Sequence, residues 1–205
     1  MNKREHILQV AETLFAEHGY EGTSVRLLAK NSAVNIAMIS YYFGSKEKLF
    51  EALVEYRASS LKDKLKSVGK ETDNPVKIIE QVVDLIVDRI FSNPDFHRLL
   101  HREISLEQRS KMASNIVDVL MQNFIEVKKI IRKGIKKRIF RDVDIEMLLC
   151  SIFSTASQVA QSSLLTKKML ELDDKKNSSG KKEVRNRTKN YLKDLLKNYL
   201  LVKVK

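Results

Sequence analysis

Apolar residues recur every three or four positions along most of the chain, a spacing that places them on one face of an α-helix. The first run puts four of them on such a face: Ile7, Ala11, Leu14 and Phe15. Gly and Pro, which a turn-rich sheet fold needs, number only six and two in 205 residues. We therefore predict an all-α fold of about nine helices.

Two short helical runs joined by a tight turn occupy residues 24–43. Either Thr23 or Ser24 can cap the first run, and Asn35 can cap the second, which extends over residues 36–43. Helices this short are marginal alone and need bracing by longer neighbours. The layout is typical of a helix-turn-helix, whose second helix enters the major groove of DNA. A generic helical corner is the alternative at this point.

Beyond residue 66 the predicted helices are longer, and their starts carry capping signals. Asn74-Pro75 and Asn93-Pro94 each pair a capping Asn with a Pro at the first helical position, where its missing N–H costs nothing. Ser105 and Gln108 have the spacing of a capping box that would open a long helix. Residues 173–182 are predicted to be a polar linker before a final amphipathic helix.

The net charge of +12 favours an anionic partner such as nucleic acid or a membrane surface, but it does not locate the contact. Residues 1–57 hold seven basic and seven acidic side chains, so the excess lies further along, and residues 128–141 contribute eight basic and no acidic ones. Cys150 is the only cysteine, which excludes an internal disulfide and fits a reducing cytosol. We expect Cys150 to be a small core residue, and we expect no metal and no cofactor.

The segment Gly22–Phe50, GTSVRLLAKNSAVNIAMISYYFGSKEKLF, resembles the N-terminal DNA-binding domain of the tetracycline-repressor (TetR) family of bacterial transcription regulators. Its most specific part is SYYFGSKEKL, and the preceding AETLFAEHGYEGTS resembles the family's first helix and the loop after it. The rest of the chain resembles the family only in helix number, order and length. The resemblance implies a helix-turn-helix DNA-binding domain over residues 1–46 and a helical ligand-sensing and dimerisation domain over residues 47–205.

The resemblance also implies a two-fold dimer that binds a palindromic operator and usually represses transcription. Thr23 matches a hydroxyl residue that often meets a phosphate, Tyr42 an aromatic near the DNA backbone, and Lys46 a phosphate-contacting lysine. The chain departs from the family at Ala37, where Gly is common, and at Ser40, where Tyr is common. These departures remove a close backbone approach to the bases and an aromatic contact with the duplex.

A helical wheel of residues 36–43 predicts which side chains would face DNA, independently of the resemblance to the family. The inward face is predicted to carry Ile36, Ile39 and Phe43. The other positions then lie opposite or on the flanks: Ala37, Met38, Ser40 and Tyr41. No charged residue occurs from position 31 to 45, so hydroxyl hydrogen bonds and thymine-methyl contacts replace the common Arg-to-guanine contact. We therefore predict an operator half-site in which A·T pairs supply much of the readout.

Phosphate contacts must then come from cations outside this helix, although for most of them a solvated surface charge is an equal alternative. These cations are Lys3, Arg4, Arg26, Lys30, Lys46 and Lys48. The candidate DNA-binding residues are Thr23, Arg26, Asn35, Ala37, Met38, Ser40, Tyr41, Tyr42 and Lys46.

The charge-free stretch 147–166 is rich in small residues, which allow close helix approach. We expect its helix and the last helix to form a four-helix bundle in a homodimer, with an intramolecular helix pair as the alternative. A small-molecule effector of unknown identity is expected to bind among the longer helices. Candidate pocket residues, each of which could equally be ordinary core, are Phe91, Phe96, Leu100, Met121, Phe124 and Phe153.

Two other classes of function compete with DNA binding. The sequence contains no phosphate-binding Gly loop, nucleophile elbow or paired metal motif that would indicate an enzyme. The stronger alternative is a basic helical protein that binds anionic membrane surfaces through its C-terminal helix, in which Leu and Tyr alternate with Lys. We expect a cytoplasmic, non-enzymatic transcription regulator, a repressor relieved by its ligand, that has no membrane partner.

Overall fold

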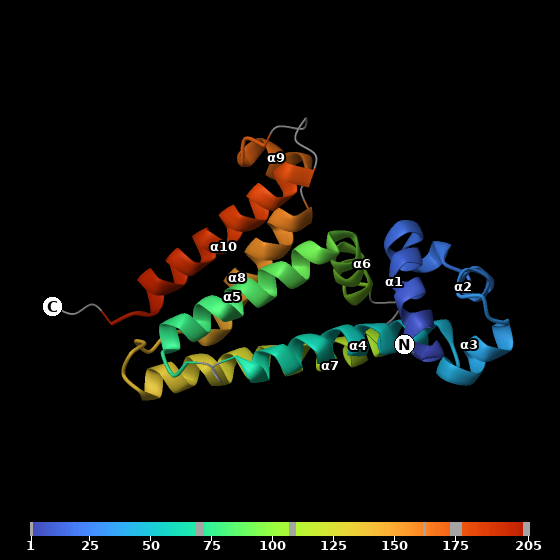
Figure 1. Cartoon of the computed structure of the whole chain (residues 1–205), viewed down its shortest axis with the longest axis horizontal. Coiled ribbons are helices and arrows are strands. Elements are labelled where there is room, and N and C mark those ends of the chain that lie inside the picture. Colours follow the sequence, from blue (N-terminus) through green and yellow to red (C-terminus); the bar gives the residue numbers. More distant parts are fainter. Residues whose placement is uncertain (1, 69–71, 107–109, 162, 173–177, 203–205) are drawn as a thin grey trace. The chain divides into compact units, whose positions relative to one another are not determined.

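The computed structural model describes residues 2–68, 72–106, 110–161, 163–172 and 178–202. Within these ranges the protein consists of ten α-helices and no strand, which confirms the predicted all-α class (Figure 1). The helices are α1 (Lys3–Gly22), α2 (Val25–Asn31), α3 (Ile36–Phe43), α4 (Lys46–Ser67), α5 (Pro75–Ser92), α6 (Pro94–Ile104), α7 (Ser110–Lys136), α8 (Ile145–Gln161), α9 (Leu164–Met169) and α10 (Ser178–Leu200). They form two compact units, one of residues 1–60 and 95–122, the other of residues 61–94 and 123–205.

The first unit has an aromatic core that braces its short helices. The rings of Phe15 and Tyr20 from α1 stack at 5.6 Å between centroids, and Phe50 from α4 meets both edge-on at 5.1 and 5.4 Å. All three side chains are fully buried, and Ile39 and Phe43 from α3 are buried beside them. Burial of an aromatic or aliphatic side chain stabilises by about 1.5–3 kcal/mol, so this core fixes α3 although α3 is too short to form alone.

The ends of α2 and α3 follow the capping rules. Ser24 Oγ accepts a hydrogen bond from the Leu27 N–H at 3.1 Å, and Asn35 Oδ1 accepts one from the Met38 N–H at 2.8 Å. The Asn35 cap is therefore confirmed, and Ser24 rather than Thr23 caps α2. Gly44 ends α3 at φ +79°, a backbone angle that side-chain-bearing residues rarely adopt.

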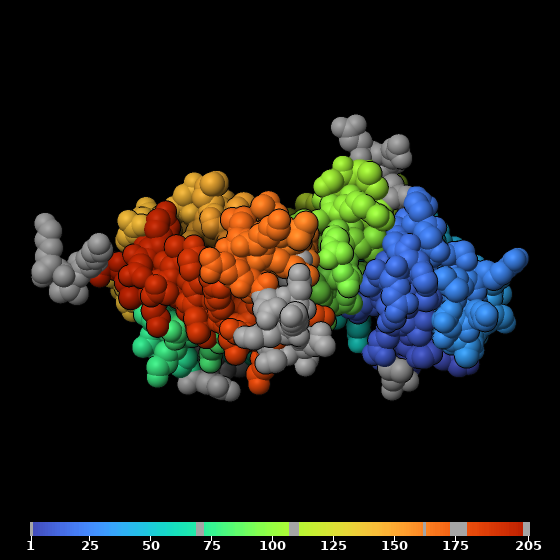
Figure 2. All heavy atoms as spheres, turned by 90° about the horizontal axis from the view of Figure 1, so that it is seen from above, coloured from blue at the N-terminus to red at the C-terminus, as the bar shows by residue number. Residues whose placement is uncertain are grey.

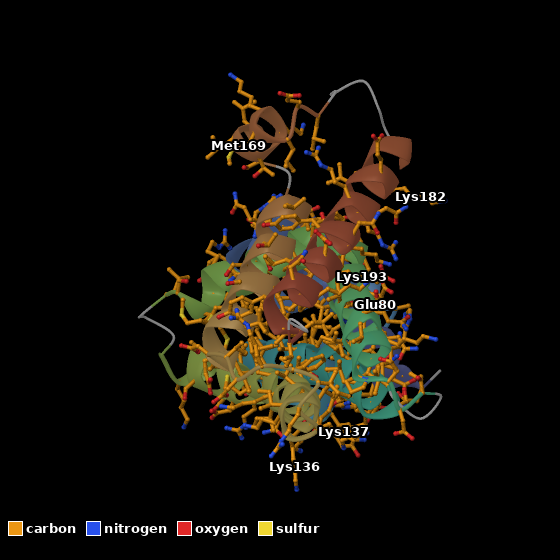
Figure 3. The ribbon with its side chains drawn as sticks, turned by 90° about the vertical axis from the view of Figure 1, so that its left-hand side faces the viewer. Glu80, Lys136, Lys137, Met169, Lys182 and Lys193 are labelled. Atoms are coloured by element: carbon orange, nitrogen blue, oxygen red, sulfur yellow. The ribbon has the colours of Figure 1, made fainter. Side chains whose placement is uncertain are left out.

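In the second unit α5, α8 and α10 pack on one another around a second apolar core (Figure 1). One side of α10 is also joined to α5 by a row of ion pairs, which we call the α5–α10 ladder. Its acids are Glu80, Asp84 and Asp88, and its bases are Arg185, Lys189, Lys193 and Lys197, with N–O distances of 2.5–3.6 Å. Figure 3 shows Lys193 of α10 and Glu80 of α5 on this side of the unit.

The short helix α9 is the element that the sequence did not predict. The charge-free stretch after Met147 has the composition of one continuous helix, yet Ser163 accepts a hydrogen bond from the Thr166 N–H and starts a new one. Figure 2 shows α9 beside α10 on the surface of the second unit, where Arg187 Nη1 donates to the Leu170 carbonyl at 3.0 Å. The structure therefore has a helix break before the polar linker, between the end of α8 at Gln161 and the start of α9 at Leu164.

Three further expectations concern the proposed capping box, the polar linker and Cys150. Gln108 of the proposed capping box lies outside the described residues, and the Ser105 hydroxyl instead donates to the His101 carbonyl at the end of α6. The linker residues 173–177 also lie outside the described residues. Cys150 is exposed, so its assignment to the core was wrong: it lies on the outer side of α8, whose inner side holds Leu148, Leu149 and Ile152.

Candidate nucleic-acid interface

The outer face of α3 is the candidate reading surface. Because a helix turns by about 100° per residue, positions 36, 37, 40 and 41 form one continuous face. All four residues there are exposed, and Tyr41 is the most exposed large hydrophobic side chain among the described residues at 83%. On the opposite side, Ile39 and Phe43 retain only 2% and 6% exposure, as the wheel predicted.

Ile36 does not lie where the wheel placed it. Its side chain is 44% exposed, because the buried and partly buried arc of α3 runs from Met38 and Tyr42 through Ile39 to Phe43 and leaves Ile36 just beyond the Phe43 edge. Ile36 therefore joins Ala37, Ser40 and Tyr41 on the outer face. Its apolar character pointed to the core, and only the observed rotation of the helix identifies it as a surface residue.

The aromatic residues at the end of α3 link this face to the core. Tyr41 and Tyr42 meet at 5.3 Å between ring centroids with an interplanar angle of 74°, and Tyr42 lies 6.2 Å from Phe43. Tyr42 is partly buried and packs against the core of the first unit. Its ring therefore supports the exposed ring of Tyr41 from the side.

Thr23 is a correction to the predicted phosphate contacts. Its side chain is fully buried, and Thr23 Oγ1 lies within hydrogen-bond distance of the carbonyl oxygens of Leu14 and Gly19, at 3.1 and 2.7 Å. The hydroxyl therefore closes the end of α1 and is not accessible to a phosphate. The neighbouring Ser24, which is exposed at the N-terminus of α2, is the hydroxyl residue on the surface.

Lys46 is held by groups of the protein at the start of α4. Its Nζ donates to the Tyr20 carbonyl at 3.1 Å, lies 4.3 Å from the centroid of the Tyr20 ring, and is 3.8 Å from a carboxylate oxygen of Glu21. The side chain retains 21% exposure. The ammonium is thus fixed in direction at the end of α1, where it partly faces solvent.

The other predicted phosphate contacts are solvent-exposed, namely Lys3, Arg4, Arg26, Lys30 and Lys48. Arg4 is additionally oriented, because its guanidinium carbon lies 5.4 Å from the centroid of the Phe43 ring. Asn35 is also exposed, although its Oδ1 is occupied by the α3 cap.

A partly buried ion pair holds α1 and α4 together beneath this surface. Arg57 Nη1 lies 3.2 Å from a carboxylate oxygen of Glu12, and the two side chains are 19% and 14% exposed. The Arg57 guanidinium also lies 5.9 Å from the centroid of the Phe96 ring. Burial lowers the pKa of Arg57, and the Glu12 carboxylate opposes this shift.

The six candidate pocket residues are divided between the two units. Phe96 and Leu100 are buried in the core of the first unit, and Met121 is 46% exposed. Phe91, Phe124 and Phe153 lie at the edge of the second core, where Phe124 and Phe153 are 4.4 Å apart between ring centroids. A small cavity of about 80 Å³ in the second unit is lined by other residues: Val68, Asp73, Pro75, Ile78, Ile130, Lys133 and Gly134.

The C-terminal helix does not present the free basic face that the membrane alternative needs. Four of its cations pair with acids of α5 in the α5–α10 ladder. Among the described residues, no helix combines the length and the apolar character that a bilayer crossing requires. The membrane alternative is therefore not favoured.

A capped eight-residue helix, braced by an aromatic core and exposing one face, defines a helix-turn-helix DNA-binding protein. The comparisons with known proteins agree. Residues 7–53 match the model of the tetR family of bacterial regulatory proteins, and residues 75–187 match the tetracyclin repressor-like C-terminal domain. The chain belongs to the tetR family and is a DNA-binding transcription regulator.

Individual relatives show how far the similarity extends. The transcriptional repressor NicS of Pseudomonas putida is 28% identical over 141 residues, which cover 68% of this chain and 66% of NicS. The chain thus matches about two thirds of the length of this curated relative. The hemolysin II regulator HlyIIR is 26% identical, with a TM-score of 0.65 over 94% of this chain and 97% of HlyIIR. The fatty acid degradation regulator FadR of Bacillus halodurans, 19% identical, has a TM-score of 0.75 over 94% and 95% of the two chains.

Members of this family share three general properties. Its members bind DNA operators as dimers, they respond to small-molecule effectors, and they are generally non-enzymatic.

Proposed function

We propose that this protein is a cytoplasmic, non-enzymatic repressor that binds a palindromic operator as a homodimer and is relieved by a small molecule. The observation that carries the proposal is the outer face of α3, where Ile36, Ala37, Ser40 and Tyr41 form one exposed surface on a rigid, capped helix. A face of this width fits the major groove, and its chemistry is that of hydroxyl and apolar contacts.

The remaining contacts are proposed around this face. Met38 and Tyr42 lie on its flank, and Asn35 lies at the N-terminus of α3, whose backbone N–H groups favour a phosphate. Arg26 and Lys46 extend the surface to α2 and α4, and they are the proposed phosphate contacts that fix the docking direction. Thr23 is proposed to support the surface indirectly, because its hydroxyl hydrogen-bonds to carbonyl groups of α1.

The readout is proposed to favour A·T pairs, because α3 has no cation for the guanine edge. Thymine methyl groups can contact Ile36 and Ala37, and the hydroxyls of Ser40 and Tyr41 can donate to base acceptors. An unbiased selection of bound duplexes tests this point. Half-sites that hold A·T pairs are expected, whereas a core of G·C pairs alone would contradict the proposal.

The two proposed kinds of interaction can be separated by mutation. Replacing Arg26 or Lys48 by Gln should weaken binding to all duplexes alike and reduce the slope of log K against log salt by about 0.9 for each phosphate that is no longer neutralised. Replacing Ser40 or Tyr41 by Ala should instead change which sequence is preferred. A uniform loss from the α3 variants would count against a reading role for this face.

The DNA-binding domain is proposed to comprise residues 1–46 and the ligand-sensing and dimerisation domain residues 47–205. The family models support this order of domains, since they match residues 7–53 and 75–187, although the first match extends beyond residue 46. Dimerisation is proposed through α8 and α10. Met147 on α8 and Tyr191 on α10 are 63% and 56% exposed, and both are large hydrophobic side chains that a second copy would cover.

The effector site is proposed to lie in the second unit beside Phe91, Phe124 and Phe153, whose rings offer an apolar wall. The cavity of about 80 Å³ elsewhere in this unit is smaller than the roughly 300–1,000 Å³ typical of ligand sites. Binding would relieve repression if the effector prefers the conformation that does not fit the operator.

A further inference from the structure

The end of α7 carries the strongest group of unpaired charge in the described part of the chain. Of the eight basic residues between positions 128 and 141, three are engaged: Lys128 pairs with Glu146, Lys129 with Glu126, and Arg141 contacts the Tyr199 carbonyl and ring. The other five are all exposed and form no ion pair with the described residues. We call these five the basic turn: Arg132, Lys133, Lys136, Lys137 and Arg138.

The basic turn is held in place by the protein. The N–H groups of Lys137 and Arg138 donate to the carbonyls of Lys133 and Ile135 at 3.1 and 2.8 Å, and Phe140 N–H donates to Gly134 O at 3.2 Å. The following strand-like residues are joined to the end of α10, where the Arg141 N–H donates to the Leu200 carbonyl at 2.8 Å. The five charges therefore sit on a fixed scaffold.

Close packing inside the turn reinforces this scaffold. A side-chain carbon added at Gly134 would lie 2.1 Å from Cδ2 of the buried Phe140 ring, so only Gly fits there. Figure 3 shows Lys136 and Lys137 at the edge of the second unit, pointing away from α5 and α10.

The helix dipole alone does not account for five cations. It favours one or two positive charges in the last turn, by about 0.3–1 kcal/mol each, whereas like charges four residues apart, as at Arg132 and Lys136 or Lys133 and Lys137, repel one another. Asp142 follows the turn and forms no ion pair with it among the described residues. A polyanion would reduce the repulsion among these like charges.

We infer that the basic turn is a second, sequence-independent binding surface for the phosphate backbone of duplex DNA. Two observations on charge favour this partner. The first unit, which carries α3, has no charge excess over residues 1–57, and the α5–α10 ladder consumes cations of α10, so much of the remaining free positive charge lies here. Non-specific DNA affinity depends on such charge.

The surface chemistry distinguishes DNA from other anionic partners. Every apolar side chain between positions 130 and 140 is buried or partly buried, so the turn itself has no exposed apolar residue to insert into a lipid surface. Beside it, at the end of α10, Tyr199 and Val202 are 38% and 50% exposed, which is less apolar surface than an interfacial helix presents. Protein interfaces are depleted in Lys and need apolar or aromatic anchors, which the turn also lacks. Duplex DNA, with about one charge per 1.7 Å of axis, needs only fixed cations.

The test compares two variants of the full-length protein that have the same reduction in charge. One carries R132Q, K133Q, K136Q, K137Q and R138Q, and the control carries K64Q, K77Q, K168Q, K181Q and K182Q, all at exposed positions of other helices. Thermal unfolding checks that both are folded. Binding to a random-sequence duplex is then measured over a series of salt concentrations.

The basic-turn variant is expected to bind the random duplex at least tenfold more weakly than the control at low salt. Its slope of log K against log salt is expected to be shallower by about 2–4 than that of the control, since each phosphate left without its cation reduces the slope by about 0.9. Equal affinities and slopes for the two variants would overturn the inference. So would a larger basic-turn effect on binding to phosphatidylglycerol vesicles than to the duplex at equal phosphate concentration.

The outcome can be separated from that of the proposed α3 readout. Repeating the comparison in a Tyr41→Ala background removes a proposed base contact and leaves the basic turn intact. The difference between the two charge variants on random duplex should persist there. If sequence-specific recognition were absent altogether, this difference would still be measurable, so the two proposals fail independently.

Discussion

Tyr41 is the residue on which the reading surface depends most. Because it is 83% exposed, replacing it by Ala should change the unfolding temperature little, while operator affinity should fall by about 1–3 kcal/mol, or roughly five- to 150-fold. Fluorescence anisotropy with a selected duplex measures the loss. Leu165→Ala, which removes an exposed apolar side chain of α9, is the matched control and should keep operator affinity within about twofold.

Gly44 makes a residue-scale prediction about stability. Its φ of +79° and ψ of −57° are unfavourable for any residue with a side chain, so Gly44→Ala should destabilise the protein by about 1–3 kcal/mol. Thermal unfolding measures this change. The control is Gly22→Ala, whose backbone lies outside the left-handed region and whose added carbon would make only an ordinary 3.4 Å contact with His18; an equal loss there would contradict the explanation.

At the scale of single elements, sequence and structure agree where local chemistry decides. The Asn35 cap, the inward pair Ile39 and Phe43, and the break after α3 follow from neighbouring residues, so they were predictable. Ile36 and Thr23 were misplaced because their surroundings come from other elements: the Thr23 hydroxyl meets carbonyls of α1, and the rotation of α3 is set by the whole core. The ion pairs of the α5–α10 ladder and the contacts of Lys46 with Tyr20 join segments that are far apart in the sequence. They could therefore not be predicted from neighbouring residues.

The α5–α10 ladder gives a prediction at this scale. Glu80 and Lys197 form its terminal pair at 2.6 Å, with side chains 29% and 42% exposed. Reversing one charge, as in Glu80→Lys, should destabilise the protein by about 0.5–1 kcal/mol, and the loss should shrink at high salt. The double variant E80K/K197E should regain most of the stability in urea unfolding. A double variant as unstable as the sum of the single ones would show that the pair does not contribute.

For the whole molecule, we expect that the dimer can be dissociated without unfolding the protomers. Introducing Arg at both Met147 and Tyr191 places charge on the proposed contact face of α8 and α10 without disturbing buried residues. Sedimentation should then show monomers with unchanged helicity, and operator affinity should fall because one half-site is bound at a time. Arg at Met169, another exposed apolar residue outside α8 and α10, is the control; dimers that persist in the double variant would exclude this interface.

The most direct measurement is an unbiased selection of duplexes by the purified protein from a random pool, repeated with the Tyr41→Ala variant. We predict that the native chain enriches a two-fold symmetric site whose half-sites contain A·T pairs and lie about one helical turn, roughly 34 Å, apart. The variant should enrich a weaker or altered half-site. A folded native protein that enriches no sequence over the starting pool at moderate salt would contradict a DNA-reading role for α3.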